Sequence, residues 1–182
     1  MMEILTEYEL RLRKREILKK IAAGAVFIYP TDTIYGLGGN ATNEATVKRI
    51  RQIKERQDKP FSVCAPSKEW IRQKAVESQK NNPSIDTLPG PYTLIITVHR
   101  NGIAQNVNPE NDTLGVRIPD HWFTNYIKEL NLPLITTSVN KTNEPFMTSL
   151  EDLDPDIEKK VDFIIYEGEK KGKPSKIIDL ND

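Results

Sequence analysis

The segment of residues 25–59 constrains the fold of this chain more than any other part of the sequence. Residues 25–29 form an apolar run rich in β-forming side chains, which is typical of a buried strand. Pro30 has no N–H to donate, so we expect the strand to end there. A loop rich in hydroxyl groups and glycine follows at residues 31–40, and a helix with Asn43 as N-cap comes next. A strand, a polar loop and a helix in this order are typical of one wall of an anion-binding site.

The helix predicted after Asn43 ends in a dense group of cations. Because the chain must unwind toward Pro60, Lys54 and Arg56 can point into one cleft instead of diverging as they would in mid-helix. Favourable pairing with the helix C-terminal dipole is the simpler interpretation, but it does not require so many charges. A polyphosphate ligand would account for the excess. The cations are Arg49, Arg51, Lys54, Arg56 and Lys59.

The composition is ordinary for a soluble globular protein. Of 182 residues, 37% are hydrophobic and 29% are charged, and the formal net charge is zero, which gives no argument for a nucleic-acid or membrane partner. We expect a single domain spanning residues 1–182. Cys64 is the only cysteine, which excludes an internal disulfide and a cysteine-based zinc site. Because there is no signal-peptide core and no apolar run of membrane-spanning length, we predict a cytoplasmic protein without membrane contact.

Predicted strands and helices alternate along the chain without a regular βαβ period. The fold class is therefore α/β, with a twisted mixed sheet and flanking helices. Thr6 opens the first helix with a capping box, and Gly24 ends it. Two more helices are predicted at residues 67–79 and 121–130, and a helical turn is predicted near Leu150. Further strands are predicted at residues 61–64, 92–98, 113–118, 134–137, 161–166 and 175–180.

Polar residues beside the predicted strands are the other site candidates. Ser138 and Asn140 directly follow the strand of residues 134–137, at the end where open α/β sheets bind ligands; an N-cap or Asx turn is the alternative. Arg117 lies in a strand, either at the surface or on the floor of a cleft. The glycines of residues 36–39 match neither a dinucleotide fingerprint nor a Walker A loop, so they indicate a turn or a close approach to a ligand. The sequence contains no nucleophile motif and no paired histidines.

Taken together, these motifs resemble the YrdC-like family, the threonylcarbamoyl-AMP synthases. The similarity runs from about residue 10 to residue 180 and is that of the short, single-domain form. The first block, together with the Ser-x-Asn motif, is its most specific part. The matching blocks are Tyr29-Pro30-Thr31-Asp32-Thr33-Ile34-Tyr35-Gly36-Leu37-Gly38, Lys54-x-Arg56, Pro89-Gly90-Pro91-x-Thr93-Leu94, Val116-Arg117-Ile118-Pro119, Ser138-x-Asn140 and Pro174-Ser175.

The resemblance implies a reaction and a set of partners. Members of the family convert L-threonine, bicarbonate and ATP into threonylcarbamoyl-adenylate and pyrophosphate. A tRNA threonylcarbamoyl transferase complex then modifies the adenosine next to the anticodon, so tRNA or other double-stranded RNA is a candidate partner. Mg²⁺ is expected to accompany the triphosphate, without a metal bound by the protein alone. The family fold implies a concave, electropositive cleft in the sheet.

The resemblance also assigns roles to residues. Arg117 would fork onto the threonine carboxylate, and Lys54 would neutralise phosphate charge together with Arg56 and Lys59. Threonine would be held by Thr33, Cys64, Arg117, Thr136 and Ser175. ATP would be held by Arg56, Lys59, Thr113, Ser138 and Phe146. The catalytic set would be Lys54, Arg56, Ser138 and Asn140.

Two other functions are compatible with the same residues. An RNA-binding module would grip backbone phosphates in the cleft, with a steep salt dependence and no consumption of ATP. A related carbamoyl-transfer enzyme would differ in its substrate. For Cys64, a buried small hydrophobic residue is the alternative to a contact with the ligand.

Overall fold

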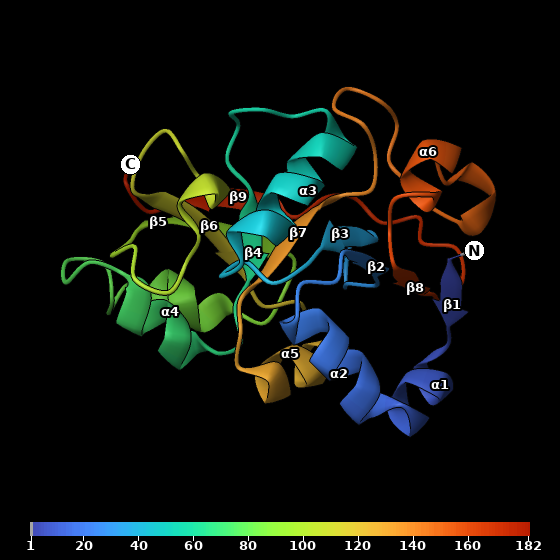
Figure 1. The fold of residues 1–182 in the computed structure, drawn as a ribbon. Helices are drawn as coiled ribbons and strands as arrows, with labels where there is room; N and C mark the ends of the chain where they lie inside the picture. The colour runs from blue at the N-terminus through green and yellow to red at the C-terminus, as the bar shows by residue number, and fades with distance from the viewer. Residues whose placement is uncertain (1) are drawn as a thin grey trace.

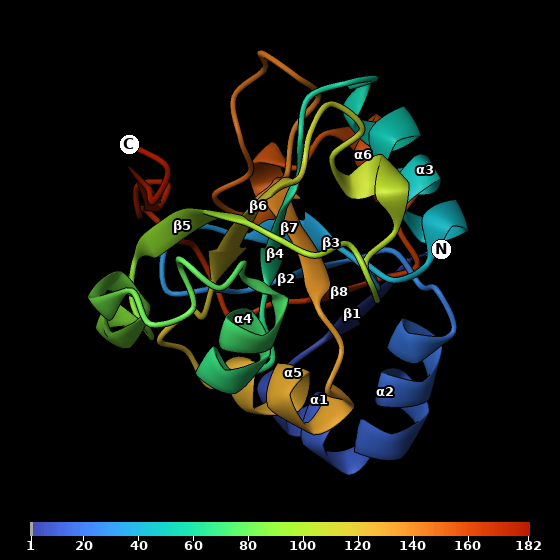
Figure 2. The same cartoon turned by 90° about the vertical axis from the view of Figure 1, so that its left-hand side faces the viewer.

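The computed structural model describes residues 2–182, and a nine-stranded sheet lies at its centre (Figure 1). The strands are Glu3–Leu5 (β1), Phe27–Tyr29 (β2), Gly36–Gly38 (β3), Ser62–Cys64 (β4), Tyr92–Thr97 (β5), Thr113–Arg117 (β6), Leu134–Ser138 (β7), Phe163–Ile165 (β8) and Lys176–Asp179 (β9). They lie in the order β1-β8-β2-β3-β7-β4-β6-β5-β9. Four neighbouring pairs run parallel and four run antiparallel. The predicted mixed sheet is therefore confirmed, and its strands cross at an angle in Figure 2, as in a twisted sheet.

Helices cover both faces of this sheet. The α-helices are Glu7–Leu12 (α1), Lys14–Ala22 (α2), Glu44–Lys54 (α3), Lys68–Lys74 (α4), Thr124–Leu130 (α5) and Pro155–Glu158 (α6), and the 3₁₀ turns are Pro83–Thr87 (η1), Gln105–Val107 (η2) and Leu150–Asp152 (η3). In β2, Phe27 and Tyr29 belong to the core under α1, α2 and α5, whereas Ile28 belongs to the core under α3, α4 and α6. Alternate residues of a strand face opposite sides, so one buried strand serves both cores. Figures 1 and 2 both show α1, α2 and α5 grouped at the lower edge of the molecule.

Most of the predicted elements are confirmed. Thr6 caps α1 by accepting from the Glu9 N–H at 3.2 Å, and Asn43 caps α3 by accepting from the Thr46 N–H at 3.1 Å. Every strand predicted between residues 61 and 180 is present, with ends that differ by no more than two residues. The helical turn predicted near Leu150 is η3. These elements carry their signals locally, in caps and in runs of β-forming residues.

The prediction of a loop throughout residues 31–40 is wrong, because Gly36–Gly38 forms β3. This strand pairs antiparallel with β2 on one side and with β7 on the other. Glycine is unfavourable in strands, so the sequence of residues 36–38 gives no signal for a strand. Glycine is nevertheless required here, since a Cβ atom at Gly38 would lie 1.9 Å from the carbonyl oxygen of Ile135.

Three helix predictions are also wrong in part, and one of these helices, predicted at residues 121–130, begins only at Thr124 (α5). The N-terminal helix is divided at Arg13, where φ of −109° and ψ of 22° interrupt the helical path. The helix predicted to reach Gln79 ends at Lys74, because the N–H of Val76 turns back to donate to the carbonyl of Thr97 at 3.0 Å. Strand β1 and helix α6 were not predicted. Both are short, and their positions are set by packing against distant parts of the chain.

We expect Gly38→Ala to lower the free energy of unfolding by about 3 kcal/mol, because the new methyl group would overlap the backbone of β7, which the sheet holds in place. Gly90→Ala is the matched control, since a Cβ atom there meets nothing closer than 3.4 Å. The control should change stability by no more than about 0.5 kcal/mol. Urea denaturation of the three proteins measures both effects. Equal stability of the two variants would contradict the tight approach of β3 to β7.

Candidate functional site

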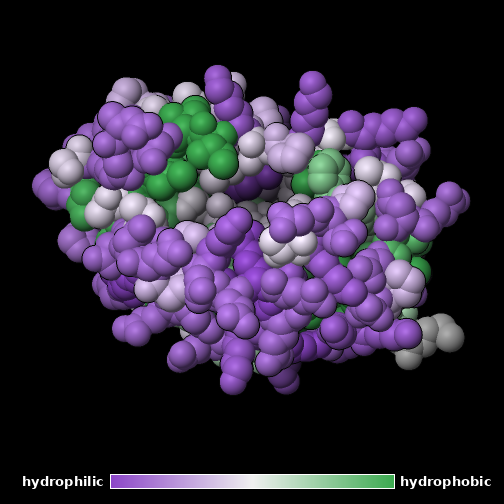
Figure 3. Space-filling model, turned by 90° about the horizontal axis from the view of Figure 1, so that it is seen from above, coloured by the Kyte–Doolittle hydropathy of each residue, from purple (hydrophilic) through white to green (hydrophobic). Residues whose placement is uncertain are grey.

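A cavity of about 270 Å³ opens where β3 begins and β7 ends. Its walls come from segments far apart in the sequence: the loop before β3, the ends of β6 and β7, and the segment that leads into β9. Figure 3 shows a hollow near the centre of one face, with hydrophilic residues in its depth and an apolar patch beside it. The electropositive character of the cleft stays a prediction.

Four of the five residues predicted to hold threonine line this cavity: Thr33, Arg117, Thr136 and Ser175. Arg117 ends β6, Thr136 lies in β7, and Ser175 immediately precedes β9. The Ser175 hydroxyl lies 2.6 Å from that of Thr93 on the neighbouring strand β5. The order of strands in the sheet therefore brings together side chains that are widely separated in the chain.

Arg117 is almost completely enclosed, with 5% of its surface exposed. Its Nη1 donates to the Thr33 hydroxyl at 3.1 Å, and its Nη2 donates to the Asp32 carboxylate. Its Nε has no hydrogen-bond partner among the residues that the structure describes. A guanidinium does not lose its proton in a protein, so this buried cation depends on Asp32 for its counter-charge.

Lys54, the last residue of α3, stands behind the part of the wall formed by Ser138. Its Nζ donates to the Ser138 carbonyl at 2.7 Å and to Asn140 Oδ1 at 2.6 Å. The Ser138 hydroxyl donates to the same Asn140 oxygen at 2.6 Å. The backbone carbonyl of Lys54 accepts from the N–H of Thr142 at 2.9 Å. Helix α3 and the Ser-x-Asn segment are thus locked together at the edge of the cavity.

The ammonium group of Lys54 has an unusual environment. The side chain is 2% exposed, and its hydrogen-bond acceptors within residues 2–182 are neutral oxygens rather than carboxylates. Burial, and then repulsion by Arg56, lower the pKa of Lys54 to about 7. A nearby anion would favour the charged form.

Arg56 and Lys59 do not line the cavity. Glu55 has a left-handed backbone, with φ of 51°, and redirects the chain as α3 ends. Arg56 then donates to the Pro60 carbonyl at 2.6 Å, with its guanidinium 5.1 Å from the centre of the Phe61 ring. Lys59 is exposed. Lys54 therefore contacts the Ser-x-Asn motif, whereas Arg56 and Lys59 do not.

Two other cations of the cluster hold the fold together. Arg49 forms an ion pair with Asp162 at 2.9 Å. Arg51 donates to the carbonyls of Asn106 and Val107 and lies over the Phe61 ring. The interpretation of the whole cluster as a phosphate site is therefore too broad, because these two side chains are already used in packing.

The residues predicted to hold ATP are only partly brought together. Ser138 and Phe146 line the cavity, whereas Thr113 does not. Thr113 and Arg117 nevertheless lie on the same face of β6, since they are four residues apart in a strand. Gly115 lies between them, where a Cβ atom would come within 2.3 Å of the Ser62 hydroxyl oxygen.

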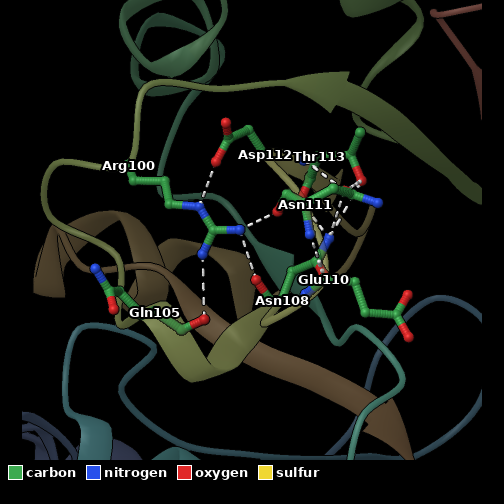
Figure 4. Close-up of polar contacts among 7 residues, drawn as sticks. All are labelled: Arg100, Gln105, Asn108, Glu110, Asn111, Asp112 and Thr113. Atoms are coloured by element: carbon green, nitrogen blue, oxygen red, sulfur yellow. Dashed lines mark hydrogen bonds and ion pairs between the residues drawn. The ribbon is translucent and has the colours of Figure 1, made fainter.

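Thr113 is held by a polar loop that Arg100 organises (Figure 4). The Thr113 hydroxyl donates to Asn111 Oδ1 at 2.6 Å, and its N–H donates to the same oxygen at 2.9 Å. Arg100 donates to the Asp112 carboxylate at 2.6 Å and to the Asn108 carbonyl at 2.6 Å. Arg100 also donates to the carbonyls of Gln105 and Asn111, so four residues surround one guanidinium and hold the loop from which Thr113 continues.

Cys64 is fully buried and does not line the cavity. Its sulfur lies 3.6 Å from the Tyr29 hydroxyl. Burial raises the pKa of the Cys64 thiol, so the neutral form is favoured. This environment is that of a small core residue behind the cavity wall.

Within residues 2–182, no cluster of three or more His, Cys, Asp or Glu side chains has an arrangement suited to a metal ion. The described helices include none with both the length and the apolar character needed to cross a membrane.

Residues 19–182 match the model of the Sua5/YciO/YrdC family, which is described as "Telomere recombination". The chain belongs to the Sua5/YciO/YrdC family. The match covers the strand, loop and helix of residues 25–59 and every residue that lines the cavity. The resemblance to YrdC-like proteins that the motifs indicated is thereby confirmed.

Individual members of the Sua5/YciO/YrdC family are similar over most of this chain. A protein of Methanocaldococcus jannaschii, provisionally named threonylcarbamoyl-AMP synthase, is 39% identical over 99% of this chain and 88% of its own length. The threonylcarbamoyl-AMP synthase of Vibrio campbellii is 29% identical over 90% of this chain and 92% of its own length. The crystal structure of Pyrococcus abyssi Sua5 complexed with L-threonine has a TM-score of 0.87 and 30% identity, over 100% of this chain and 55% of that one. This chain therefore spans about half the length of the Pyrococcus protein.

Two partners of the family's site residues were not predicted from the sequence. These are Asp32, which contacts Arg117, and Thr93, whose hydroxyl pairs with that of Ser175. A signal for Asp32 was present, because it is the only charged residue between Lys20 and Glu44. If such a single charge is buried, it needs a partner of opposite sign. The identity of that partner depends on the fold.

Lys54→Met tests whether the Lys54 ammonium is destabilised by burial. Between pH 7 and the ordinary lysine value of 10.5, the unfolded chain still holds the proton that folded Lys54 has released. The unfolded state then binds more protons, so Lys54 makes the folded protein gain stability as the pH rises through this window. We expect the gain between pH 7 and about pH 9.5 to be larger in the unmodified protein than in the variant, by up to about 3 kcal/mol. Urea denaturation at both pH values measures it, and an identical pH response would contradict the lowered pKa.

Proposed function

We propose that this protein is a threonylcarbamoyl-AMP synthase, which forms L-threonylcarbamoyladenylate and pyrophosphate from L-threonine, bicarbonate and ATP. One observation carries the proposal: Thr33, Arg117 and Ser175 share a cavity with Ser138, and Lys54 is bonded to Ser138 from behind. A group that recognises carboxylates and a cation suited to phosphates therefore lie at one cavity. Relatives that carry the name of this activity, and the threonine complex of the Pyrococcus protein, support the same assignment.

In this proposal Arg117 receives the threonine carboxylate. Arg117 lines the cavity, and a guanidinium pairs well with a carboxylate. The hydroxyls of Thr33, Thr136 and Ser175 can donate or accept, so they suit the amino and hydroxyl groups of threonine. Cys64 is buried behind the cavity wall, so it would support the lining residues without contacting threonine.

The triphosphate lies toward Lys54 in this proposal. Ser138 and Phe146 contact the nucleotide from the cavity wall, and Asn140 keeps Lys54 in place. Arg56 and Lys59 reach the phosphates from the segment that follows α3. Thr113 contacts the nucleotide from the start of β6. Binding of the phosphates raises the pKa of Lys54 again, so the complex takes up a proton above pH 7.

The proposed chemistry requires positioning rather than a protein nucleophile. The threonine amine first attacks the carbon of bicarbonate; a C–N bond forms, a C–O bond breaks, and a carbamate and water result. A carbamate oxygen then attacks the α-phosphate of ATP, a new P–O bond forms, and the bond to pyrophosphate breaks. Negative charge grows on the leaving pyrophosphate, where Lys54 and Arg56 stabilise it.

The partners follow from this reaction. The cavity wall offers no carboxylate from the described residues, so Mg²⁺ would arrive with the triphosphate and keep water and phosphate oxygens as its ligands. The product would pass to a tRNA threonylcarbamoyl transferase complex in the cytoplasm, with tRNA or double-stranded RNA as a further contact. We propose that residues 1–182 act as one domain in this reaction.

Release of pyrophosphate from ATP, measured with and without L-threonine and bicarbonate, tests the proposal. We expect release to depend on both. Consumption of ATP without threonine would contradict the assignment. RNA binding with a steep salt dependence and no ATP turnover would support an RNA-binding module instead.

We expect Lys54→Ala to lower threonine-dependent pyrophosphate release by about a hundredfold or more, since it removes a preorganised charge at the leaving group. Lys48→Ala is the matched control, because Lys48 lies on the same helix and is exposed. The control should keep full activity. Thermal unfolding of both variants establishes that the fold persists. Undiminished turnover of Lys54→Ala would remove Lys54 from the mechanism.

A further inference from the structure

We propose that Asp32 is a positioning and specificity residue of this site. Its ion pair with Arg117 fixes the guanidinium that takes the threonine carboxylate, and it cancels a charge that would otherwise attract phosphate to the amino-acid end of the cavity. This inference rests on the proposed function. Asp32 does not itself line the cavity, so it acts through Arg117.

Asp32 is held firmly enough to position its partner. One carboxylate oxygen accepts from Arg117, and the other accepts from the N–H of Asp120 at 3.0 Å. The side chains of Asp32 and Arg117 are 11% and 6% exposed, so water screens their attraction weakly. The loop before β3 and the end of β6 are thereby joined by an ion pair that is anchored at both sides.

The same contacts hold the Arg117 guanidinium in place. Its Nη2 is bound to Asp32, and its Nη1 is bound to Thr33, whose hydroxyl lies 3.1 Å from that of Thr31. A planar guanidinium held at two nitrogens cannot rotate. The guanidinium of Arg117, a residue that lines the cavity, is therefore held in one fixed orientation, as recognition of a carboxylate requires.

The two cations at the cavity differ in their counter-charge. Arg117 has the carboxylate of Asp32 beside it, whereas Lys54 contacts only the neutral oxygens of Ser138 and Asn140 among the described residues. A zwitterionic amino acid with no net charge suits the compensated end. A triphosphate suits the uncompensated end. The ion pair thus favours threonine at the Arg117 end of the cavity and leaves the triphosphate to the Lys54 end.

Asp32→Asn tests this inference, because the amide keeps the size of the side chain and its acceptor oxygen but removes the charge. We expect the KM for L-threonine to rise about tenfold or more, since a buried cation has lost its partner. The KM for ATP should stay within about twofold. Inorganic phosphate should become a competitive inhibitor against threonine, an effect that a merely structural role of Asp32 would not produce.

Asp86→Asn is the matched control, because Asp86 forms an ion pair with Arg72 in which its own side chain is 65% exposed. It should leave both KM values and the response to phosphate unchanged. If the unmodified protein releases no pyrophosphate in response to threonine, the proposed function itself fails. If the unmodified protein is active and Asp32→Asn changes neither the threonine KM nor the inhibition by phosphate, only the role of Asp32 is overturned.

Asp32→Glu keeps the test decisive if Asp32→Asn does not fold. Glutamate retains the charge but displaces the carboxylate by one methylene group. We expect it to raise the KM for threonine while phosphate still fails to inhibit. Inhibition by phosphate with an unchanged threonine KM would overturn the inference, because charge and position would then have the opposite effects.

Discussion

The close approach of β3 to β7 is the contact on which the rest of the structure depends. β3 pairs with β2 on one side and with β7 on the other, so it joins the two parts of the sheet. Gly38 permits this, because a side chain there would overlap the carbonyl of Ile135. A second glycine has a similar function at the cavity: a Cβ atom at Gly172 would lie 2.0 Å from the Thr33 carbonyl oxygen, so the segment leading into β9 packs directly on the loop before β3. Backbone contacts thus set the distance between Thr33 and Ser175.

Lys54 is placed where it lowers the stability of the free protein. A buried ammonium with no carboxylate beside it among the described residues loses hydration that three neutral oxygens replace only in part. Leucine or methionine would fill the same space without this cost. The cost has a purpose if the ligand supplies the anion, because the attraction is then strong in a site from which water is excluded. Asn140 and Ser138 hold the charge in position before the ligand arrives, so little reorganisation is needed on binding.

The predictable parts of this protein are those with local signals. Asn43 carries its capping function in its own side chain, and the site motifs around Thr33, Arg117 and Ser138 identify the family. Strand β3 could not be predicted, because its partner β7 lies about a hundred residues away and its glycines give no pattern. The direction of Arg56 could not be predicted either, since it depends on the left-handed conformation of the residue before it. The family motifs identify the site residues, but only the fold shows which of the cations among them have an acidic side chain beside them.

Compensation also explains why composition is a poor guide to this site. The chain has equal numbers of acidic and basic side chains, and many of its cations are paired: Arg13 with Glu16, and Arg49 with Asp162. Such exposed pairs contribute little field at a distance, because water and salt screen them. The field in the cavity therefore depends on the few charges that are buried there. Arg117 is neutralised by Asp32, and Lys54 is not. A count of residues cannot reveal this difference in counter-charge.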